Sequence, residues 1–508
     1  MPTARVYLIG AGPGDPGLLT LRGRQRLAAA DVVLYDYLVN PQALRYARPG
    51  AELVCLGRHG QGHGRVLSQG EVHQRMIAAA QAGKAVARLK GGDPAIFGRT
   101  AEEIAALEAA GVAYEIVPGV SAAQAASAYA GIPLTSRESA SGVAFITGQL
   151  CRDKPGESLD LEGIARFPGT LVFYMGVTSA AEWAAGLMAH GKPAETPVAI
   201  VRRASLPQQQ VLTATLGELA DVVARAKLRP PAVMIVGEAA RARASFDWFA
   251  SRPLHGQTVL VTRPVHQADA LAEQLSELGA AVLFQPAIEI TPPADWAPVD
   301  AAIENLAAYD WLVFSSANGV AAFIERLQHH RLDLRALHRA KLAAIGPATA
   351  EALAEYRLRA DLQPDEFRAE ALAAALAAEG VGRRFLLLRA SRGREVLAEA
   401  LAAAGAAVEQ VVVYQSRDVT TADVEVSAAL AAGRIDWITV TSSAIARALV
   451  HLFGDHLRNA RLAAISPITA GVLEEMGHQA AAVATTYTAQ GLAEAIVARS
   501  PVAQPPSF

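Results

Sequence analysis

The second half of the chain contains an internal repeat, and this repeat constrains the fold more than any other feature. The segment GQTVLVTRPVHQADALAEQLSELGAAV begins at Gly256, and GRRFLLLRASRGREVLAEALAAAGAAV begins at Gly382, 126 residues later. The same offset aligns DWLVFSSANGVAAFI at Asp310 with DWITVTSSAIARALV at Asp436, and AAIGPATAEAL at Ala343 recurs 120 residues later. Each copy has the pattern of a strand, a helix and a strand, followed by strand–turn–helix units. We expect two similar α/β lobes with a cleft between them, since two copies are too few for a solenoid.

Short apolar runs with strand character alternate with helical patterns in residues 1–240. The helical periodicity is clearest over Glu71–Ala82 and Thr100–Ala110. The predicted strands are Val6–Ile9, Val32–Tyr35, Leu53–Leu56, Ala85–Leu89, Val143–Ile146, Leu171–Tyr174, Val198–Val201 and Val233–Val236. Because strands and helices alternate, we predict an α/β fold with largely parallel sheets for this half.

A short polar and aromatic stretch, Ala239–His255, lies between the last of these strands and the start of the repeat. It contains Phe246, Trp248 and Phe249 together with several arginines, so we expect it to pack against a neighbouring surface. The 508 residues are enough for several domains, each with its own core. The predicted division is a first domain over 1–240, a linker over 241–255 and a second domain over 256–508.

The composition excludes several classes of protein. The net charge is only −3, whereas nucleic-acid-binding proteins usually carry a basic excess. Cys55 and Cys151 are the only cysteines, so we expect neither a disulfide framework nor a zinc site built on several cysteines. No signal-peptide pattern follows Met1, and charged residues interrupt every apolar run before the roughly 18 residues of a spanning helix. The expectation is a cytoplasmic protein with no metal site, no nucleic-acid partner and no membrane partner.

A glycine-rich turn follows the first predicted strand. The sequence GAGPGDPG at residues 10–17 contains four glycines, which let a ligand approach the backbone closely. The spacing differs from the G-x-G-x-x-G fingerprint of dinucleotide-binding proteins, and Pro13 removes an N–H that could bind a pyrophosphate. Tight packing alone would also explain such a turn. If the turn binds a ligand, the proline favours one without phosphates.

Other small or polar residues also follow predicted strands. Residues 91–94 (GGDP) follow one strand, residues 118–122 (PGVSA) open a helix of small residues, and residues 175–176 (MG) follow another strand. Asp36 ends the strand VVLYD. Taken singly, each is explained as a turn glycine or a helix cap. Because open α/β sheets bind ligands at the carboxyl ends of their strands, the whole set predicts a ligand site at that edge.

With these motifs, residues 5–240 closely resemble the tetrapyrrole methylases, and most specifically the uroporphyrinogen-III C-methyltransferases. The motifs that carry the resemblance are GAGPGDPGLL (10–19), DVVLYD (31–36), LKGGDPAIFGR (89–99), PGVSA (118–122), GIPLT (131–135), YMG (174–176) and VGE (236–238). The resemblance implies two α/β domains with S-adenosylmethionine in the trough between them, and a homodimer formed through this half.

The resemblance also implies the residues of the site. The cofactor contacts it implies are Pro13, Gly91, Gly92, Asp93, Ile96, Ser121, Ala122, Met175 and Ala204. Asp36 stands where the family places its proposed base, and the alternative role for Asp36 is a helix cap. Arg58 stands where the family often has a lysine proposed as a proton donor. Because arginine stays protonated, the role that remains for Arg58 is binding substrate carboxylates.

Hydroxyl and amide side chains recur at strand ends in the second half. They occur in Thr262-Arg263, in Ser315-Ser316-Ala317-Asn318 and in Thr441-Ser442-Ser443, each before a helical pattern. Helix capping explains one serine at each place, while helix N-termini also bind anions. Arranged around one cleft, these groups are suited to a substrate with several carboxylates.

Residues 256–498 resemble the uroporphyrinogen-III synthases, through VLVTRP, VFSSANGV, AAIGPATAEAL, LLLRASRGREVL, VVVYQS and VTSS. The resemblance implies two flavodoxin-like lobes joined by two strands. It also implies closure of hydroxymethylbilane to uroporphyrinogen III with inversion of ring D. The substrate-binding residues expected here are Arg263, Ser315, Ser316, Asn318, Ser442 and Ser443. Tyr414 in VVVYQS is the best candidate for a catalytic acid, and the alternative is a strand aromatic near the hinge.

Together the two resemblances predict a bifunctional enzyme. Its second half makes uroporphyrinogen III, and its first half methylates that product twice with S-adenosylmethionine to precorrin-2, toward sirohaem or cobalamin. The predicted partners are therefore the tetrapyrrole substrates. The alternative is a nicotinamide-dependent oxidoreductase fused to a bilobal small-molecule sensor. That alternative needs a phosphate-binding fingerprint, and both Pro13 and the glycine spacing count against it.

Overall fold

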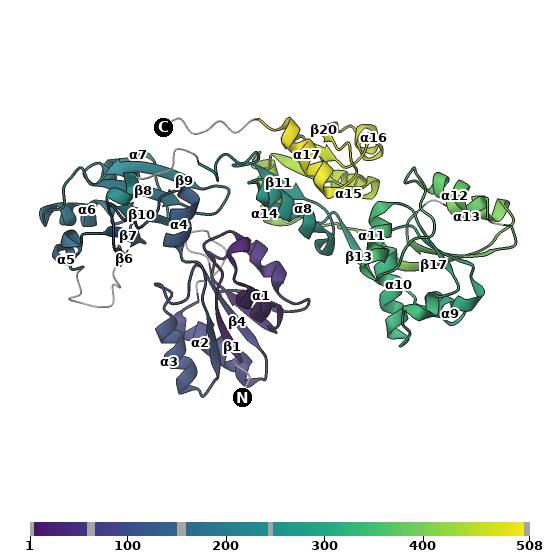
Figure 1. Cartoon of the computed structure of the whole chain (residues 1–508), viewed down its shortest axis with the longest axis horizontal. Coiled ribbons are helices and arrows are strands. Elements are labelled where there is room, and N and C mark those ends of the chain that lie inside the picture. Colours follow the sequence, from purple (N-terminus) through teal and green to yellow (C-terminus); the bar gives the residue numbers. More distant parts are fainter. Residues whose placement is uncertain are drawn as a thin grey trace. The chain divides into compact units, whose positions relative to one another are not determined.

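The structure, a computed structural model, describes residues 5–57, 67–149, 159–241, 247–379, 381–393 and 395–501. The chain forms two compact units (Figure 1). The first comprises Met1–Gln257 and Glu277–Ala281, and the second comprises Thr258–Ser276 and Val282–Ser500. No helix in the described part of either unit is long and apolar enough to cross a membrane.

The first unit contains two five-stranded sheets. The first sheet is parallel throughout and has the order β3-β2-β4-β1-β5. Its strands are β1 (Val6–Gly10), β2 (Val32–Tyr35), β3 (Glu52–Cys55), β4 (Val86–Lys90) and β5 (Tyr114–Val117). The second sheet has the order β6-β7-β10-β8-β9. Its strands are β6 (Val143–Thr147), β7 (Thr170–Tyr174), β8 (Pro197–Arg202), β9 (Gln210–Thr215) and β10 (Ala232–Val236).

The second sheet is mixed, so the prediction of largely parallel sheets is wrong for it. β6 pairs in parallel with β7, but β10 is antiparallel to both β7 and β8, and β9 is antiparallel to β8. A short turn joins β8 to β9, and a turn of that length permits only an antiparallel pair. The strands predicted for this half are all present, with ends that agree within one residue. The sequence did not predict β5 or β9, because YEIV and QVLTAT are short and mix polar with apolar residues.

Helices cover both faces of the first sheet. Alternate strand residues such as Ile9 and Leu8 point to opposite faces, where one core contains Leu27 of α1 and the other contains Met76 of α2 and Leu107 of α3. The alanines of α4 pack instead against β7, β8 and β10 of the second sheet. The helices of this unit are α1 (Leu21–Ala28), α2 (Gln69–Gln81), α3 (Thr100–Ala109), α4 (Ala122–Ala130), α5 (Leu161–Arg166), α6 (Ala180–Ala189) and α7 (Leu219–Arg225). Helix α4 therefore connects the two sheets of the unit.

The second unit contains two lobes, each built on a five-stranded sheet. The sheet of lobe A has the order β12-β11-β18-β19-β20, which is the strand order of flavodoxin. Its strands are β11 (Thr258–Val261), β12 (Ala281–Phe284), β18 (Trp437–Val440), β19 (Arg461–Ala464) and β20 (Ala480–Val483). The sheet of lobe B has the order β13-β17-β16-β14-β15. Its strands are β13 (Ile288–Thr291), β14 (Trp311–Phe314), β15 (Lys341–Ala344), β16 (Arg384–Ala390) and β17 (Ala407–Asp418).

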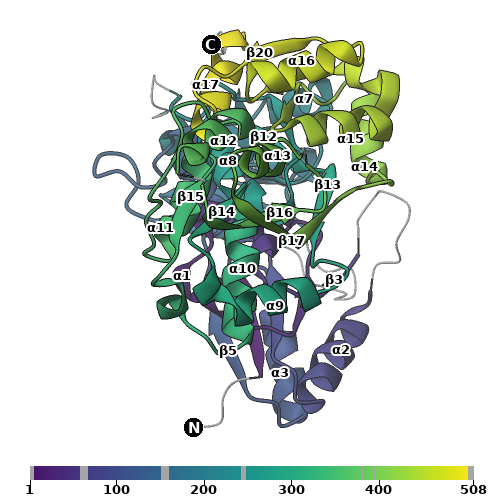
Figure 2. The same ribbon diagram turned by 90° about the vertical axis from the view of Figure 1, so that its right-hand side faces the viewer.

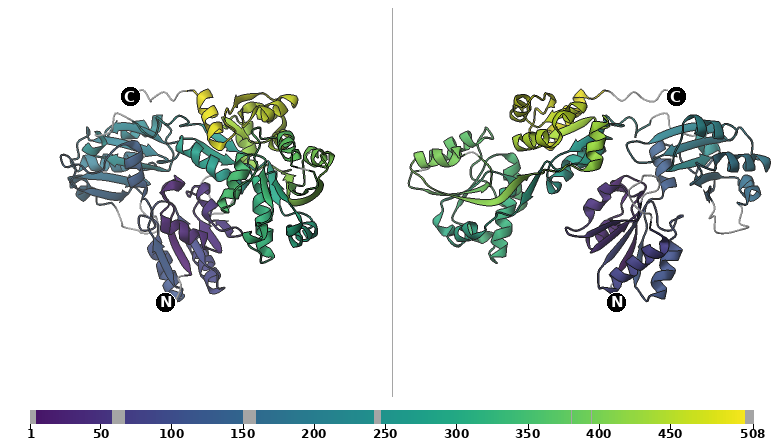
Figure 3. Two further views of the ribbon diagram at one scale, coloured as in Figure 1. Left: turned by 45° about the vertical axis from the view of Figure 1, so that its right-hand side comes forward. Right: turned by 180° about the vertical axis from the view of Figure 1, so that it is seen from behind.

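The two predicted lobes are present, but neither lobe is one copy of the repeat. Lobe A combines the start of the first copy, β11 and β12, with the end of the second copy, β18 to β20. Lobe B combines the end of the first copy with the start of the second. In Figures 1 and 3 the yellow C-terminal strands accordingly share a lobe with the teal β11, whereas the green middle of the chain forms the other lobe. The repeat thus builds each lobe from halves of both copies.

Helices cover both faces of the lobe B sheet (Figure 2). Leu312 and Leu386 belong to the core beneath α9 and α10, while Val313 and Phe385 belong to the core beneath α12 and α13. The helices of the second unit are α8 (Val265–Glu277), α9 (Ala297–Glu304), α10 (Ala317–His329), α11 (Pro347–Glu355), α12 (Ala369–Ala377), α13 (Val396–Ala403), α14 (Val424–Ala431), α15 (Ser443–Phe453), α16 (Pro467–Glu475) and α17 (Ala489–Arg499). Most of them follow a strand directly, so their N-termini lie at the carboxyl ends of the sheets.

Two chain segments cross between the lobes, as the resemblance implied. One leads from β12 into β13 and the other leads from β17 into α14. β13 pairs antiparallel with the end of β17, in a register that places Ile288 opposite Asp418. Val419 N donates to Ala287 O at 2.9 Å, and Asp423 N donates to Gln285 Oε1 at 2.7 Å. The two crossing segments are therefore hydrogen-bonded to each other.

Candidate functional site

Three glycine-rich turns of the first unit converge at the carboxyl ends of β1, β4 and β5. Gly12 and Gly92 exchange backbone hydrogen bonds of 3.2 and 2.7 Å. A Cβ on Gly119 would lie 2.4 Å from Gly92 O, and a Cβ on Gly10 would lie 2.6 Å from Gly119. Gly92 also has a φ of +72°, which side chains other than glycine rarely adopt. These contacts require glycine and leave the turns with bare backbone.

The Asp93 carboxylate shapes the second of these turns. Its Oδ1 accepts from Ala95 N at 2.7 Å, and its Oδ2 accepts from Gly119 N at 2.9 Å. Ile96 lies in the same turn, where its N–H donates to Asp93 O at 3.2 Å. Gly91, Gly92, Asp93 and Ile96 therefore belong to one fixed turn. A ligand contact with Asp93 is expected through its main chain, since both carboxylate oxygens are engaged.

Tyr174 links the start of α4 to the second sheet. Its hydroxyl lies 2.5 Å from Ser121 Oγ and accepts from Ala123 N at 3.0 Å. Burial, as the largest cause, raises the pKa of Tyr174. The next residue, Met175, has a φ of +53° and is 48% exposed. The structure thus brings Ser121 and Ala122 close to Met175, as the predicted site requires.

Another turn, residues 203–206, lies against the first glycine-rich turn. Asp15 N donates to Ser205 Oγ at 3.1 Å. A Cβ on Gly14 would lie only 2.6 Å from Leu206 Cγ. Ala204, a predicted cofactor contact, is buried in this turn, and Pro13 lies in the turn opposite. All the predicted cofactor residues therefore belong to turns that hydrogen bonds and close glycine contacts connect.

Asp36 follows β2 and does not cap a helix. Arg88 donates from Nη2 to Asp36 Oδ1 at 2.6 Å, and the Asp36 side chain is 33% exposed. The nearby helical turn at residues 41–46 is capped by Asn40 instead. A Cβ on Gly91 would lie 3.4 Å from Leu38 Cβ, so the segment after Asp36 lies beside the second glycine turn. Arg58 lies outside the described residues.

A buried ionic network lies behind Asp36. Glu103 of α3 is fully buried and accepts from Arg88 Nε at 2.9 Å and from Lys90 Nζ at 2.6 Å. Burial lowers the pKa of Lys90, and the charge of Arg88 lowers it further. Arg88 therefore bridges Glu103 and Asp36. The network was not predicted, although two cations in the otherwise apolar strand VARLK were a signal, because buried charges need partners.

Large apolar side chains are exposed around these turns. The Phe97 and Phe145 rings lie 5.0 and 5.7 Å from the Tyr174 ring. The exposed members of this set are Tyr37, Leu38, Phe97, Phe145 and Met175. Exposed apolar groups beside bare backbone mark a ligand site, and a large ring system would cover them. In the described part of the chain, no three His, Cys, Asp or Glu side chains are placed to hold a metal ion.

In the second unit, the predicted serines lie at helix N-termini. Ser316 caps α10, accepting from Gly319 N at 3.0 Å, and Ser442 caps α15, accepting from Ile445 N at 3.2 Å. The capping that the sequence allowed at each place is therefore present. Ser315 makes a long hydrogen bond of 3.4 Å to Leu388 O. Ser443 is the first residue of α15.

Tyr414 lies near the end of β17, beside the start of α10. Its hydroxyl lies 3.1 Å from Ser316 Oγ, and only 8% of its surface is exposed. The ring belongs to the core of lobe B. Tyr414 is thus a core aromatic whose hydroxyl reaches a helix N-terminus, which leaves both of its predicted roles open.

Arg263 and Arg389 occupy equivalent positions in the two copies but differ in their partners. Arg389 Nη1 donates to Glu395 and, at 2.8 Å, to Gln410, and its other groups reach backbone carbonyls. Arg263 forms no ion pair or hydrogen bond with any described residue, and burial lowers its pKa. A partly buried cation without a partner is costly, and an anionic ligand would offset that cost.

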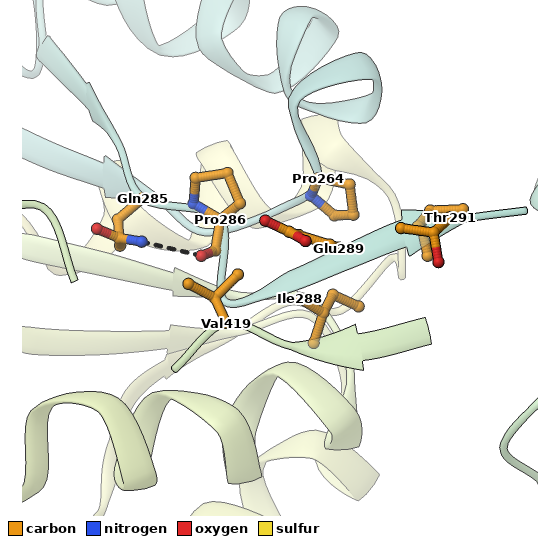
Figure 4. A pocket seen from close by; sticks show the side chains of 8 residues that line it. Pro264, Gln285, Pro286, Ile288, Glu289, Thr291 and Val419 are labelled. Carbon is orange, nitrogen blue, oxygen red and sulfur yellow. Dashed lines mark hydrogen bonds between the residues drawn. The ribbon is translucent and has the colours of Figure 1, made fainter. Parts of the chain in front are cut away.

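The two lobes approach each other near the start of α8 and α10. Gln267 Nε2 of lobe A donates to Asn318 Oδ1 of lobe B. A cavity of about 330 Å³ lies where the chain crosses between the lobes (Figure 4). It is lined by Pro264, Gln285, Pro286, Ile288, Glu289, Ile290, Thr291 and Val419. Pro264 places this cavity next to Arg263 in the chain, and the buried Thr291 hydroxyl has no hydrogen-bond partner among the described residues.

Comparison with known proteins assigns both halves. A family model for tetrapyrrole (corrin/porphyrin) methylases matches residues 5–220, and one for uroporphyrinogen-III synthase HemD matches residues 269–494. A porphyrin biosynthesis protein HemD from Ruminiclostridium josui is 34% identical over 86% of this chain and 86% of its own length. The chain belongs to both families. It joins a tetrapyrrole methylase to a uroporphyrinogen-III synthase.

Two other similar proteins each match about half of this chain. A siroheme synthase from Zymomonas mobilis is 47% identical over 49% of this chain, which spans about half, 51%, of that relative's length. A uroporphyrin-III C-methyltransferase from Thermus thermophilus, crystallised with S-adenosyl homocysteine, is 42% identical over 47% of this chain and 99% of its own, with a TM-score of 0.41. The two family models and the relative from Ruminiclostridium josui confirm, at the level of the family, the resemblances that the sequence motifs indicated.

Proposed function

We propose that this chain carries out two consecutive steps of tetrapyrrole biosynthesis. The synthase half closes hydroxymethylbilane to uroporphyrinogen III with inversion of ring D. The methylase half then transfers two methyl groups from S-adenosylmethionine to give precorrin-2, for sirohaem or cobalamin. The observation that carries the proposal is the union of the two families in one chain, with the product of one half serving as substrate of the other.

The turns of the methylase half fit S-adenosylmethionine. This cofactor, when bound, supplies an electrophilic methyl group on a sulfonium and carries no phosphate. Its adenosine and carboxylate can be held by backbone groups such as those at Gly10, Gly92 and Gly119, where a Cβ would clash with neighbouring backbone or is disfavoured by a positive φ. Pro13 removes an N–H that a pyrophosphate would use. The fit therefore favours this cofactor over a nicotinamide dinucleotide.

Asp36 is the proposed catalytic carboxylate of methyl transfer. When an electron-rich pyrrole carbon accepts a methyl group, positive charge develops on the macrocycle and a proton must leave. A carboxylate beside the ring stabilises that charge or takes the proton. Asp36 is partly exposed next to the glycine turns, and its ion pair with Arg88 fixes the orientation of its carboxylate. The exposed apolar side chains around Tyr174 provide a surface for the macrocyclic substrate.

The synthase half must hold a flexible octa-acid in one reactive conformation. The proposed anchors are Arg263, which has no partner in the described part of the chain, and the helix N-termini at Ser316 and Ser442, which attract carboxylates. Ring closure starts with loss of hydroxide from the hydroxymethyl group, which leaves an azafulvene-like cation. Tyr414 is proposed to donate the proton that lets hydroxide leave as water.

The test uses the full chain with hydroxymethylbilane and methyl-labelled S-adenosylmethionine. We expect uroporphyrinogen III to form without cofactor and two labelled methyl groups to be incorporated when the cofactor is present. Formation of isomer I alone, the product of spontaneous closure, would exclude the synthase step. Tight binding of NAD with no binding of S-adenosylhomocysteine would favour the oxidoreductase instead. Light scattering checks the expected homodimer.

A further inference from the structure

The segment that follows β10 packs onto the methylase unit. In the described residues 247–257 of this segment, Phe249 is 2% exposed. Phe249 belongs to the same core as the alanines of α4 and as Tyr129. The sequence predicted that this stretch would pack against a surface, and that surface is α4. Through Phe249, the segment therefore contributes to the methylase core.

An aromatic clasp holds Tyr129 on α4. The Tyr129 ring lies 5.1 Å from the Trp248 ring and 4.9 Å from the Phe249 ring. The Arg252 guanidinium lies over both of those rings, at 4.9 and 5.0 Å. Trp248 Nε1 donates to Ala128 O at 3.0 Å, which fixes the segment to the helix backbone. Trp248, Phe249 and Arg252 are called the clasp below.

The hydroxyl of Tyr129 reaches the first glycine-rich turn. It donates to Asp15 Oδ2 at 2.7 Å. Asp15 Oδ1 accepts from Gly17 N at 2.8 Å, so the carboxylate ties the turn together. Burial, followed by the hydrogen bond to Asp15, raises the pKa of Tyr129. The hydroxyl therefore stays protonated and remains a donor.

The backbone of Tyr129 reaches the turn that contains Ala204. Gln209 Nε2 donates to Tyr129 O at 2.9 Å, and Gln209 Oε1 accepts from Ser205 N at 3.0 Å. Ser205 Oγ in turn accepts from Asp15 N at 3.1 Å. Tyr129 is thus joined to two of the turns in the proposed cofactor site, while its ring is covered by the clasp.

We propose that Tyr129 is a positioning residue for cofactor binding and that the clasp holds it in place. The inference rests on the proposed S-adenosylmethionine site. The clasp fixes the ring, the hydroxyl fixes Asp15, and Asp15 fixes the turn that includes Pro13. A turn that is ordered before binding loses less conformational entropy when the ligand arrives. The segment between the two halves thereby contributes to the affinity of the methylase for its cofactor.

The experiment measures binding of S-adenosylhomocysteine to the full chain by calorimetry. Tyr129→Phe keeps the ring and removes the hydroxyl, and we expect the Kd to rise roughly tenfold, as for loss of one hydrogen bond to a carboxylate. Phe249→Ala should raise the Kd similarly, and Phe249→Leu, which refills part of the space, should recover part of the loss. The matched control is Tyr114→Phe, which removes a hydroxyl that donates to Glu108 at 2.8 Å elsewhere in the same unit.

Two further measurements distinguish a positioning role of Tyr129 from a general loss of folding or activity. The KM for S-adenosylmethionine should rise while kcat at saturating cofactor stays near the wild-type value, and the synthase activity of the same chain should not change. In an Asp15→Ala background, Tyr129→Phe should add little, because the hydroxyl acts through Asp15. If Phe249→Ala unfolds the unit, the Tyr129→Phe result decides.

The outcomes that overturn the proposal are distinct. Wild-type affinity in Tyr129→Phe and Phe249→Ala, equal to that of Tyr114→Phe, would refute the inference and leave the methylase assignment intact. A wild-type chain that binds no S-adenosylhomocysteine would refute the proposed cofactor site as well. A fall in kcat without a change in KM would assign Tyr129 to another step.

Discussion

Arg88 donates a 2.6 Å hydrogen bond to Asp36, and the two side chains differ sharply in exposure. Arg88 is 3% exposed, whereas Asp36 is 33% exposed at the edge of the proposed site. The buried Arg88 guanidinium therefore holds one oxygen of the Asp36 carboxylate, while the exposed part of Asp36 lies at the edge of the proposed site. We propose that this ion pair orients the Asp36 carboxylate for chemistry on the bound substrate.

Replacing Asp36 with Asn should impair catalysis far more than cofactor binding. The amide keeps the size of the side chain but can neither take a proton nor stabilise positive charge as well. We expect the rate of methyl transfer to fall by roughly 100-fold or more, while the Kd for S-adenosylhomocysteine changes little. Labelled methyl incorporation and calorimetry give the two numbers. Glu52→Gln, at the exposed strand β3, is the control. Equal, large losses in both quantities would make Asp36 a cofactor-site or folding residue.

Replacing Glu103 with Gln should destabilise the methylase unit. Glu103 is fully buried and accepts from both Arg88 and Lys90, so its loss leaves two buried cations with Asp36 as the remaining partner. Removing one member of a buried ionic network typically costs about 3–5 kcal/mol. The control Glu162→Gln breaks an exposed pair with Arg166, where less than about 1 kcal/mol is expected. Denaturant unfolding measures the free energy of unfolding of both variants. Equal losses of stability in Glu103→Gln and Glu162→Gln would show that the buried network does not stabilise the fold.

Replacing Gly92 with Val should abolish binding of S-adenosylhomocysteine while the synthase stays active. The branched side chain would occupy a turn that lies against Gly12 and Gly119. Valine would also have to adopt the positive φ of this position, +72°, which it disfavours. Gly111→Val is the matched control, since Gly111 also has a positive φ, of +65°, but has no atom within 4 Å of an added Cβ. Binding retained in Gly92→Val would mean that the cofactor lies elsewhere.

Arg389→Gln should lower stability, whereas Arg263→Gln should weaken substrate binding. Arg389→Gln loses bonds to Glu395 and Gln410, so we expect a loss of about 1–3 kcal/mol in stability with little change in KM for hydroxymethylbilane. Arg263→Gln removes a partly buried cation that has no ion-pair or hydrogen-bond partner among the described residues, so stability should hold while KM rises about tenfold. Thermal unfolding and initial rates of isomer III formation give the comparison. An unchanged KM in Arg263→Gln would remove Arg263 from the substrate site.

Local sequence patterns indicated which turns would come together in the proposed site. Glycines at strand ends such as Gly92 are visible in one short motif, and their convergence follows from the geometry of parallel strands. Pairs such as Tyr129 with Asp15, or Arg88 with Glu103, join residues from different motifs, so no local pattern indicates them. Their only signal is a charged or polar group in an apolar segment.

The sequence also could not predict that each lobe combines part of the first copy of the repeat with part of the second copy. The match of Arg263 with Arg389 shows that two segments resemble each other, but it does not show which halves share a core. That choice depends on packing between distant elements, such as β11 beside β18, whose register pairs Val259 with Trp437. In the mixed second sheet of the methylase unit, the short turn after β8 decides the direction of β9. The antiparallel pairing of β10 with β7 and β8 instead depends on strands that are distant in the sequence.

Replacing Tyr414 with Phe tests whether its hydroxyl assists the synthase reaction. The hydroxyl lies 3.1 Å from Ser316 Oγ at the start of α10, where a helix N-terminus also attracts a departing hydroxide. If Tyr414 donates a proton as hydroxide leaves, the enzymatic rate should fall, and spontaneous closure should raise the share of isomer I. The control is Tyr309→Phe, which removes a hydroxyl bonded to Glu409 in the same lobe. Because Phe fills nearly the same volume, packing should survive in both variants. Unchanged kinetics in Tyr414→Phe would leave Tyr414 as a core aromatic of lobe B and move the acid role to another group near Ser316.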